Sequence, residues 1–130
     1  KIYYELDKWR KDLDRDDLAI LRVEQLYPLP ENCLEEALSG YPDGTPVFWV
    51  QEEPENMGAW RHFRVTFGDS LLGRYPLSCI SRLASASPAT GSANAHKVEQ
   101  QAILERALNG NFKTAQPEPA NKKIGLIQRD

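Results

Sequence analysis

Carboxylates and an arginine gather where apolar segments end, and they are the first candidates for chemistry in this 130-residue chain. Glu52 and Glu53 follow one apolar run, and Arg82 follows another. Paired carboxylates beside an arginine can form a catalytic acid/base cluster, or they can form ion pairs that hold a structure together. Adjacent residues of an extended chain point to opposite faces, so these two carboxylates should not share a proton. We expect one of them to pair with Arg82 or Arg22 while the other faces a neighbouring domain.

Small residues fill the segment 85–92, which opens onto a predicted helix. Exposed N–H groups at a helix start attract anions, so a nucleotide or acyl-CoA phosphate could bind here. The alternative is a tight connection that lets another domain approach closely, because the segment has neither a Walker-type lysine nor a dinucleotide glycine fingerprint. The candidate anion-binding residues are Arg82, Ser85, Ser87, Thr90, Gly91, Ser92 and Lys97.

His96 and Trp60 are the remaining candidates. A histidine in the first turn of a helix is expected to stay mostly neutral, and it would act as a base only with a carboxylate or substrate oxygen in reach. Trp60 could stack on an adenine or belong to the core, whereas Trp49 reads as core and His62 as a surface residue. The residues expected at interdomain or dimer interfaces are Glu24, Gln51, Glu52, Glu53, Asn56, Trp60 and His96.

Composition limits the class of protein. The chain has 16 Lys and Arg against 19 Asp and Glu, a net charge of -3, and 41% apolar residues, which suits one globular domain. Neither a basic face nor an apolar run of roughly 20 residues is present, so we expect no nucleic-acid partner and no membrane. Cys33 and Cys79 are expected to be buried thiols in a reducing compartment, such as the bacterial cytoplasm.

The elements that must position these residues follow from apolar periodicity. Nearly continuous apolar runs predict strands, and apolar residues spaced by three or four predict helices. We expect strands at 18–23, 47–50 and 77–83, and helices at 2–13, 30–40, 56–71 and 93–108. Within the second helix the buried stripe would be Cys33, Ala37, Leu38 and Tyr41. Within the third it would be Trp60, Phe63, Phe67 and Leu71, with Asn56 as the cap.

Strands alternating with helices predict an α/β fold, a three-layer sandwich around a mainly parallel sheet. The carboxyl ends of its strands would bring the polar residues to one rim. The leading helix has no strand before it, so one sheet position is unfilled. After Gly110 the segment 116–120 reads as a linker, and residues 124–127 could form a short strand on the sheet edge or a disordered tail.

Three ordered stretches carry a family resemblance: residues 22–30 (RVEQLYPLP), 50–60 (VQEEPENMGAW) and 85–91 (SASPATG), followed by His96 and residues 98–101. Residues 1–109 resemble the C-terminal domain of the 2-oxoglutarate dehydrogenase family, the decarboxylating first component of the complex. The resemblance implies a transketolase-like C-terminal domain at 1–109 and a linker and tail at 110–130. The family domain begins with a strand before its first helix, and residues 123–127 could replace it.

The resemblance also implies a function. The parent enzyme uses thiamine diphosphate and magnesium, held by the preceding catalytic domains, and passes the succinyl group to the lipoyl arm of the succinyltransferase component. This segment would then have no cofactor or catalytic residue of its own and would support the homodimer and its interdomain contacts. Some members bind AMP or acetyl-CoA near interdomain surfaces. Two alternatives stay open: a detached nucleotide- or acyl-CoA-binding regulatory module, and a 2-oxoadipate dehydrogenase domain. A eukaryotic parent would place it in the mitochondrial matrix.

Overall fold

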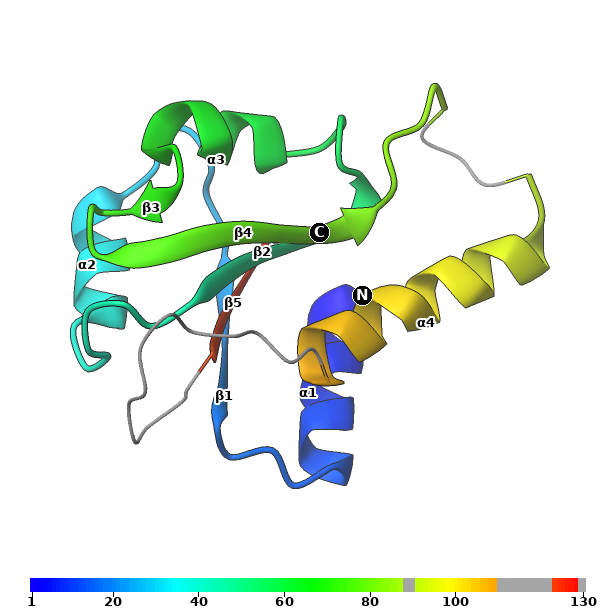
Figure 1. Ribbon diagram of the computed structural model, residues 1–130, viewed down its shortest axis with the longest axis horizontal. Helices are drawn as coiled ribbons and strands as arrows, with labels where there is room; N and C mark the ends of the chain where they lie inside the picture. Colours follow the sequence, from blue (N-terminus) through cyan, green and yellow to red (C-terminus); the bar gives the residue numbers. More distant parts are fainter. Residues whose placement is uncertain (88–90, 110–122, 129–130) are drawn as a thin grey trace.

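A computed structural model describes residues 1–87, 91–109 and 123–128 of the chain. They form a three-layer α/β sandwich, as predicted, in which helices cover both faces of a central sheet (Figure 1). The elements are α1 (Ile2–Asp12), β1 (Leu18–Val23), α2 (Glu31–Leu38), β2 (Val47–Pro54), α3 (Trp60–Phe67), β3 (Ser70–Leu71), β4 (Tyr75–Arg82), α4 (Ala93–Asn109) and β5 (Lys123–Gln128).

The described strands form one sheet in the order β1-β5-β2-β4-β3. All neighbours are parallel except β3, a two-residue strand that the sequence did not reveal and that pairs antiparallel with β4. The prediction of a mainly parallel sheet is therefore confirmed. Since β1, β2 and β4 run in the same direction, their carboxyl ends lie along one rim of the sheet.

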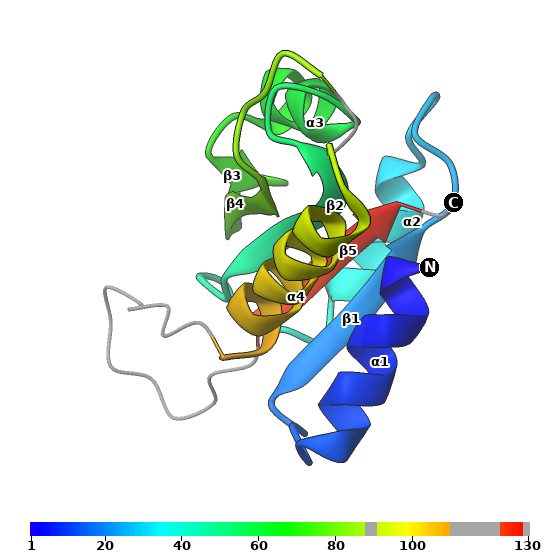
Figure 2. The ribbon, with the colours of Figure 1, turned by 90° about the vertical axis from the view of Figure 1, so that its right-hand side faces the viewer.

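The strand β5 lies inside the sheet and not at its edge, as Figure 2 shows for the red strand between β1 and β2. Leu126 and Ile127 are 0% and 1% exposed, and they pack into the cores on opposite faces of the sheet. The prediction of a strand here is confirmed, but its placement at an edge is wrong. A strand apolar on both faces belongs in the interior of a parallel sheet, where both faces are covered.

Each face of the sheet has its own core, because consecutive residues of a strand point to opposite sides. Trp49 faces α2 and α3, where its ring stacks on Phe63 at 4.3 Å between centroids. Phe48, its neighbour in β2, belongs to the cluster under α1 and α4, with Leu6 and Ile103. The prediction that Trp49 is a core residue is confirmed.

The buried residues of α2 differ from those that the sequence predicts. In α2 the buried residues are Leu34 and Leu38, spaced by one helical turn, whereas Cys33 and Ala37 are exposed. The predicted stripe is therefore rotated by one residue. The buried-thiol prediction is wrong for Cys33, and Cys79 is half-buried in β4.

The helix α3 is shorter than predicted. It begins at Trp60 without a side-chain cap, so Asn56 does not cap it, and it ends before Gly68, whose φ of 66° leaves the helical region. Leu71 lies beyond this break in β3, and its side chain is still buried in the same core as Phe63. Within the described ranges, no helix combines the length and apolar character that a membrane crossing requires.

Candidate functional site

The side chain of Gln51 ties the carboxyl end of β2 to the loop that precedes α3. It is 3% exposed. Its Oε1 accepts hydrogen bonds from Trp49 Nε1 at 2.8 Å and from the backbone N–H of Trp60 at 3.1 Å. Its Nε2 donates to the carbonyl oxygens of Pro54 at 2.9 Å and Met57 at 2.8 Å. One amide thus serves a buried indole, a helix start and three carbonyl oxygens, the third being that of Glu53 at 3.3 Å.

The loop can approach this amide because residue 58 is a glycine. Gly58 has a φ of +66°, and a Cβ placed on it would lie 3.0 Å from Oε1 of Gln51. A side chain at this position would be strained and would also press on the amide. The sequence Gln51 to Gly58 therefore folds into a closed turn around its own first side chain.

Gln51 and Trp60 do not face outward, although the sequence suggested both for an interface. Trp60 is 7% exposed, and its ring lies in the core beneath α3. Both side chains hold the domain together, which corrects that assignment. A glutamine after an apolar strand gives no hint from sequence alone that its partners lie up to nine residues further along the chain.

Glu52 points to the α1 and α4 side and is held there by Gln100. The Nε2 atom of Gln100, which is 8% exposed, donates to Glu52 Oε1 at 2.7 Å and to Glu5 Oε2 at 2.8 Å. One amide thereby joins β2, α4 and α1. Glu53 is exposed on the opposite side of the strand end, as the alternation of an extended chain predicts.

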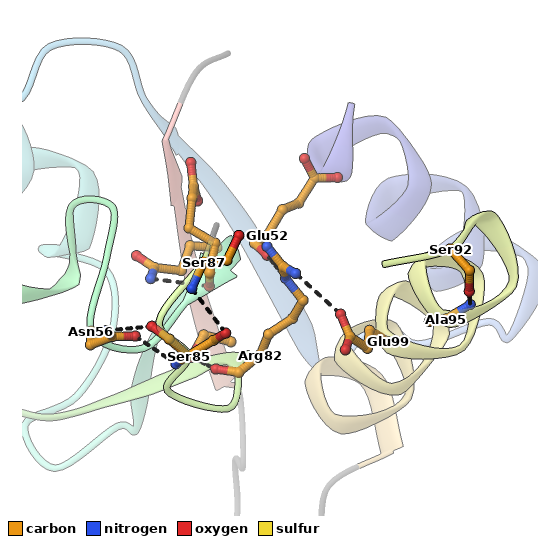
Figure 3. Close-up of polar contacts among 11 residues, drawn as sticks. Glu52, Asn56, Arg82, Ser85, Ser87, Ser92, Ala95 and Glu99 are labelled. Carbon is orange, nitrogen blue, oxygen red and sulfur yellow. Dashed lines mark hydrogen bonds and ion pairs between the residues drawn. The ribbon is translucent and has the colours of Figure 1, made fainter. Parts of the chain in front are cut away.

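Arg82 links the ends of β2 and β4 to α4 (Figure 3). Its Nε donates to the backbone carbonyl oxygen of Glu52 at 2.7 Å, and its Nη1 lies 3.2 Å from Glu99 Oε2. The Arg82 side chain is only 14% exposed. Arg22 forms an ion pair with Glu24 at 2.7 Å. Arg82 thus pairs with Glu99, which the sequence analysis did not consider, and it contacts Glu52 through the backbone carbonyl oxygen.

A pocket of about 560 Å³ opens between the end of β4 and α4. Arg106 borders it and donates from Nη1 to the carbonyl oxygen of Ser81 at 3.0 Å. Three of the predicted anion-binding residues line this pocket, namely Arg82, Ser85 and Gly91. Its remaining described walls are mostly apolar: Pro54, Leu83, Ala84, Ala95, Val98, Ala102 and Ile103, with Ser81 and Glu99 as further polar members.

Asn56 joins the two loops that the sequence analysis placed on one rim. Its Nδ2 donates to the carbonyl oxygen of Ser85 at 2.8 Å, and its Oδ1 accepts from the backbone N–H of Ser85 at 3.0 Å (Figure 3). The prediction that these segments meet is confirmed. Asn56 makes a contact within the domain, and it stays exposed enough to meet another one.

The remaining candidates lie around the start of α4. Ser92 caps the helix, since its Oγ accepts from the N–H of Ala95 at 3.1 Å. Ser87 is exposed, and its N–H donates to Ser85 Oγ at 3.3 Å. His96, in the first turn as predicted, and Lys97 are exposed and are not among the described residues that line the pocket. Thr90 lies outside the described residues.

Sequence reasoning missed the contribution of α4 to this site. Glu99, Gln100 and Arg106 all reach the strand ends, and none was a candidate. A signal was present: Glu99, Ala102 and Arg106 fall at helical spacing on one face, and Gln100 interrupts the apolar positions 103, 104 and 108. A polar residue within a buried helical stripe indicates a specific partner.

Comparison with known proteins identifies the family of this chain. The family model described as 2-oxoglutarate dehydrogenase C-terminal matches residues 1–108. This chain belongs to that family. The matched residues include every strand-end and pocket side chain described above, whereas β5 lies outside the match.

Curated relatives of the 2-oxoglutarate dehydrogenase C-terminal family agree. A "Multifunctional 2-oxoglutarate metabolism enzyme" of Mycobacterium sp. (strain JLS) is 48% identical over 109 residues, and that of Mycolicibacterium vanbaalenii is 45% identical; each match covers 83% of this chain. A "2-oxoglutarate dehydrogenase E1/E2 component" of Corynebacterium glutamicum is 39% identical over 108 residues. The matched region spans about 9% of the length of each of these relatives.

Proposed function

We propose that this chain is the noncatalytic C-terminal domain of a thiamine diphosphate-dependent 2-oxoglutarate dehydrogenase. The observation that carries the proposal is the family match over residues 1–108, in relatives of which this region is only 9%. The parent would decarboxylate 2-oxoglutarate oxidatively and pass the succinyl group to a lipoyl arm. The names of the relatives, which refer to 2-oxoglutarate, favour this substrate over 2-oxoadipate.

The contacts at the strand ends support a structural role. The buried amides of Gln51 and Gln100 and the guanidinium of Arg82 are used to join strands, helices and loops within the domain. These groups are held in place by contacts within the domain. The exposed side chains of Glu24, which pairs with Arg22, and of Glu53 lie at the same rim, and in this proposal the rim contacts the preceding catalytic domains or the homodimer partner.

We propose no cofactor or metal site for this chain. Within residues 1–87, 91–109 and 123–128, no three His, Cys, Asp or Glu side chains are grouped to hold a metal ion. The carboxylates of Glu5 and Glu52 are bridged by the amide of Gln100. In this proposal thiamine diphosphate and magnesium are held by the preceding domains, and the chain by itself is inactive.

The length of the native polypeptide tests this proposal. Mass spectrometry of the protein isolated from its source should find the peptide that contains Lys1 continuous with a long preceding sequence. Tryptic peptides upstream of Lys1 would come from the catalytic domains. A native chain that begins at Lys1, or a few residues before it, contradicts the proposal.

A second candidate function is binding of a phosphate-bearing ligand such as AMP or acetyl-CoA, and the pocket beside α4 favours it. Arg82 lines the pocket together with Ser85 and Gly91, and apolar side chains form a wall on which a base or acyl chain could pack. Titration of the protein with AMP and with acetyl-CoA by calorimetry tests it. Binding that Arg82→Gln weakens at least tenfold while Lys97→Gln leaves it unchanged would support it. The absence of heat and of chemical-shift changes at millimolar ligand would contradict it.

A further inference from the structure

The pocket at the end of β4 extends along α4. One side of it is the chain from Ser81 to Ser85, at the end of β4 and just beyond, and the other is a face of α4. The residues of α4 that line it include four at helical spacing: Ala95, Val98, Ala102 and Arg106. Since an α-helix rises about 1.5 Å per residue, this face is about 16 Å long, which equals about five residues of extended chain. We call the space between these two sides the β4–α4 groove.

The strand side of the groove is an edge of the sheet. In a strand, the N–H and C=O of one residue point to the same edge, and those of the next residue point to the opposite edge. The carbonyl oxygen of Arg82 accepts from the N–H of Glu55 on the β2 side at 3.0 Å, so the backbone groups of Ser81 point away from β2. Among the described strands only β3 lies beside this outer edge, and it pairs with Tyr75 and Pro76. The edge at Ser81 therefore has no described strand beside it, and it borders the groove.

The charged side chains of the groove favour an acidic occupant. Arg82 reaches from the strand end to Glu99 on α4 and pairs with it at 3.2 Å (Figure 3). Arg106 is exposed, and it donates to a neutral group, the carbonyl oxygen of Ser81. The described lining residues thus leave one positive charge in excess, on Arg106. The guanidinium can donate further hydrogen bonds to a carboxylate, which arginine binds in a bidentate geometry.

Two large aliphatic side chains are exposed in the groove. Leu83 is 85% exposed and Val98 is 70% exposed, and they line the groove from its two sides. Single exposed aliphatic residues are common on protein surfaces. Two that border the same groove provide a surface against which an aliphatic side chain can pack, and the small side chains of Ala95 and Ala102 leave space for it.

We propose that the β4–α4 groove binds an extended peptide segment of a partner protein. The segment lies beside the sheet edge at Ser81, as an added strand does, and it carries a carboxylate for Arg106 and an aliphatic side chain for Leu83 and Val98. This occupant differs from the AMP or acetyl-CoA of the second candidate function. The inference goes beyond the proposed role in 2-oxoglutarate dehydrogenase and does not depend on it.

A peptide library tests the proposal on the full chain. Random heptapeptides displayed on phage are selected against the immobilised protein, and the enriched sequences are made as fluorescent synthetic peptides for anisotropy measurements. These sequences should share an Asp or Glu and a Leu, Ile or Val within about five positions, because the groove offers an arginine and an aliphatic surface over that length. Methylation of single backbone nitrogens of the peptide should weaken binding at alternate positions, because alternate residues of an added strand face the edge of β4.

Variants of the protein locate the binding. Arg106→Gln should weaken binding of the synthetic peptide about tenfold or more, because it removes charge-assisted hydrogen bonds. The matched control is Arg61→Gln, the same change at an exposed arginine of α3 that is not among the described lining residues, and it should leave the affinity within about twofold. Ala102→Glu, at an exposed position of α4, should abolish binding because it fills the groove and repels an acidic peptide. Circular dichroism checks that each variant is folded.

Three results would overturn the proposal. The selection could enrich no sequence beyond those that an unrelated immobilised protein also retains, and binding of AMP or acetyl-CoA would then assign the groove to a small molecule. The enriched peptides could bind Arg106→Gln and Ala102→Glu as tightly as the wild type, which would place them elsewhere on the molecule. The chain could form a dimer in analytical ultracentrifugation that Ala102→Glu dissociates, which would show that a second copy occupies the groove.

Discussion

Replacing Gln51 by leucine is the sharpest test of how this site is held together. Leucine keeps a similar volume and removes the amide. The change deprives the indole N–H of Trp49 and the backbone N–H of Trp60 of their acceptor, and the carbonyl oxygens of Pro54 and Met57 of a donor. The structure thus predicts that one substitution removes all five hydrogen bonds of this amide, including the one to the carbonyl oxygen of Glu53 at 3.3 Å.

The size of the effect follows from the burial of these groups. A buried polar group left unsatisfied costs about 1–3 kcal/mol. The Trp49 side chain is wholly buried, so its N–H cannot turn to water, whereas relaxation of the loop can hydrate some of the other groups. We expect Gln51→Leu to lower the free energy of unfolding by about 3–5 kcal/mol, a large part of the about 5–15 kcal/mol of a typical domain.

Urea denaturation followed by tryptophan fluorescence and circular dichroism measures this loss. Glu53→Gln is the matched control, because Glu53 is adjacent and exposed, and it should change the free energy of unfolding by less than about 0.5 kcal/mol. If Gln51→Leu also stays within about 0.5 kcal/mol of the wild type, the amide does not hold the loop and the reasoning is refuted.

Three further predictions use other contacts. Gly58→Ala should destabilise the protein by about 1–3 kcal/mol, because φ at this position is +66° and the new Cβ would press on the buried amide of Gln51. The control Gly40→Ala should be nearly neutral in the same denaturation assay, because the space around Gly40 is open. Burial raises the pKa of the Cys79 thiol to about 11 from an ordinary 9.0. At pH 8 Cys79 should therefore react with a thiol reagent about a hundredfold more slowly than a thiol with the ordinary pKa. The exposed Cys33 should react before Cys79, and equal rates would contradict this prediction. Because the Cys79 thiol ionises at lower pH in the unfolded chain than in the folded one, its ionisation does not affect the free energy of unfolding below pH 9. That free energy should fall as the pH rises from 9 to about 11. Tyr75→Phe should lower the free energy of unfolding by about 1–2 kcal/mol, because the buried hydroxyl lies 2.8 Å from the carbonyl oxygen of Leu38 and 2.9 Å from that of Tyr41. An unchanged denaturation midpoint would contradict this prediction.

The sequence predicted the elements that depend on short-range pattern. The apolar run 18–23 and the helix at Ala93–Asn109 appear where expected, because continuous apolar residues suit a strand covered on both faces and residues spaced by three or four suit a helix. In α2 the pattern was too weak to fix the phase. Cys33 and Ala37 are apolar enough to be buried, so the sequence allows two alternative buried faces. The packing of Leu34 and Leu38 against the core determines which face is covered.

What the sequence could not give is the order of strands and the long-range partners of polar side chains. The sequence of residues 123–128 does not indicate that they lie between β1 and β2 and not at an edge. That placement depends on which backbone hydrogen bonds the other strands leave unmade. The same holds for Gln100, whose two carboxylate partners come from α1 and β2. The motif at 50–60 located the site, but the tertiary contacts determine what each of its residues does.

A chimera tests the central claim most directly. The matched C-terminal region of the Mycobacterium relative that is 48% identical would be replaced by residues 1–109 of this chain, and the rate of 2-oxoglutarate decarboxylation measured beside that of the parent and of a variant without the region. If the domain is a scaffold for chemistry performed elsewhere, the chimera should keep the parent's rate within about tenfold, and the deletion variant and the isolated chain should be inactive. A correctly assembled chimera without activity, or an isolated chain with activity, would contradict the account.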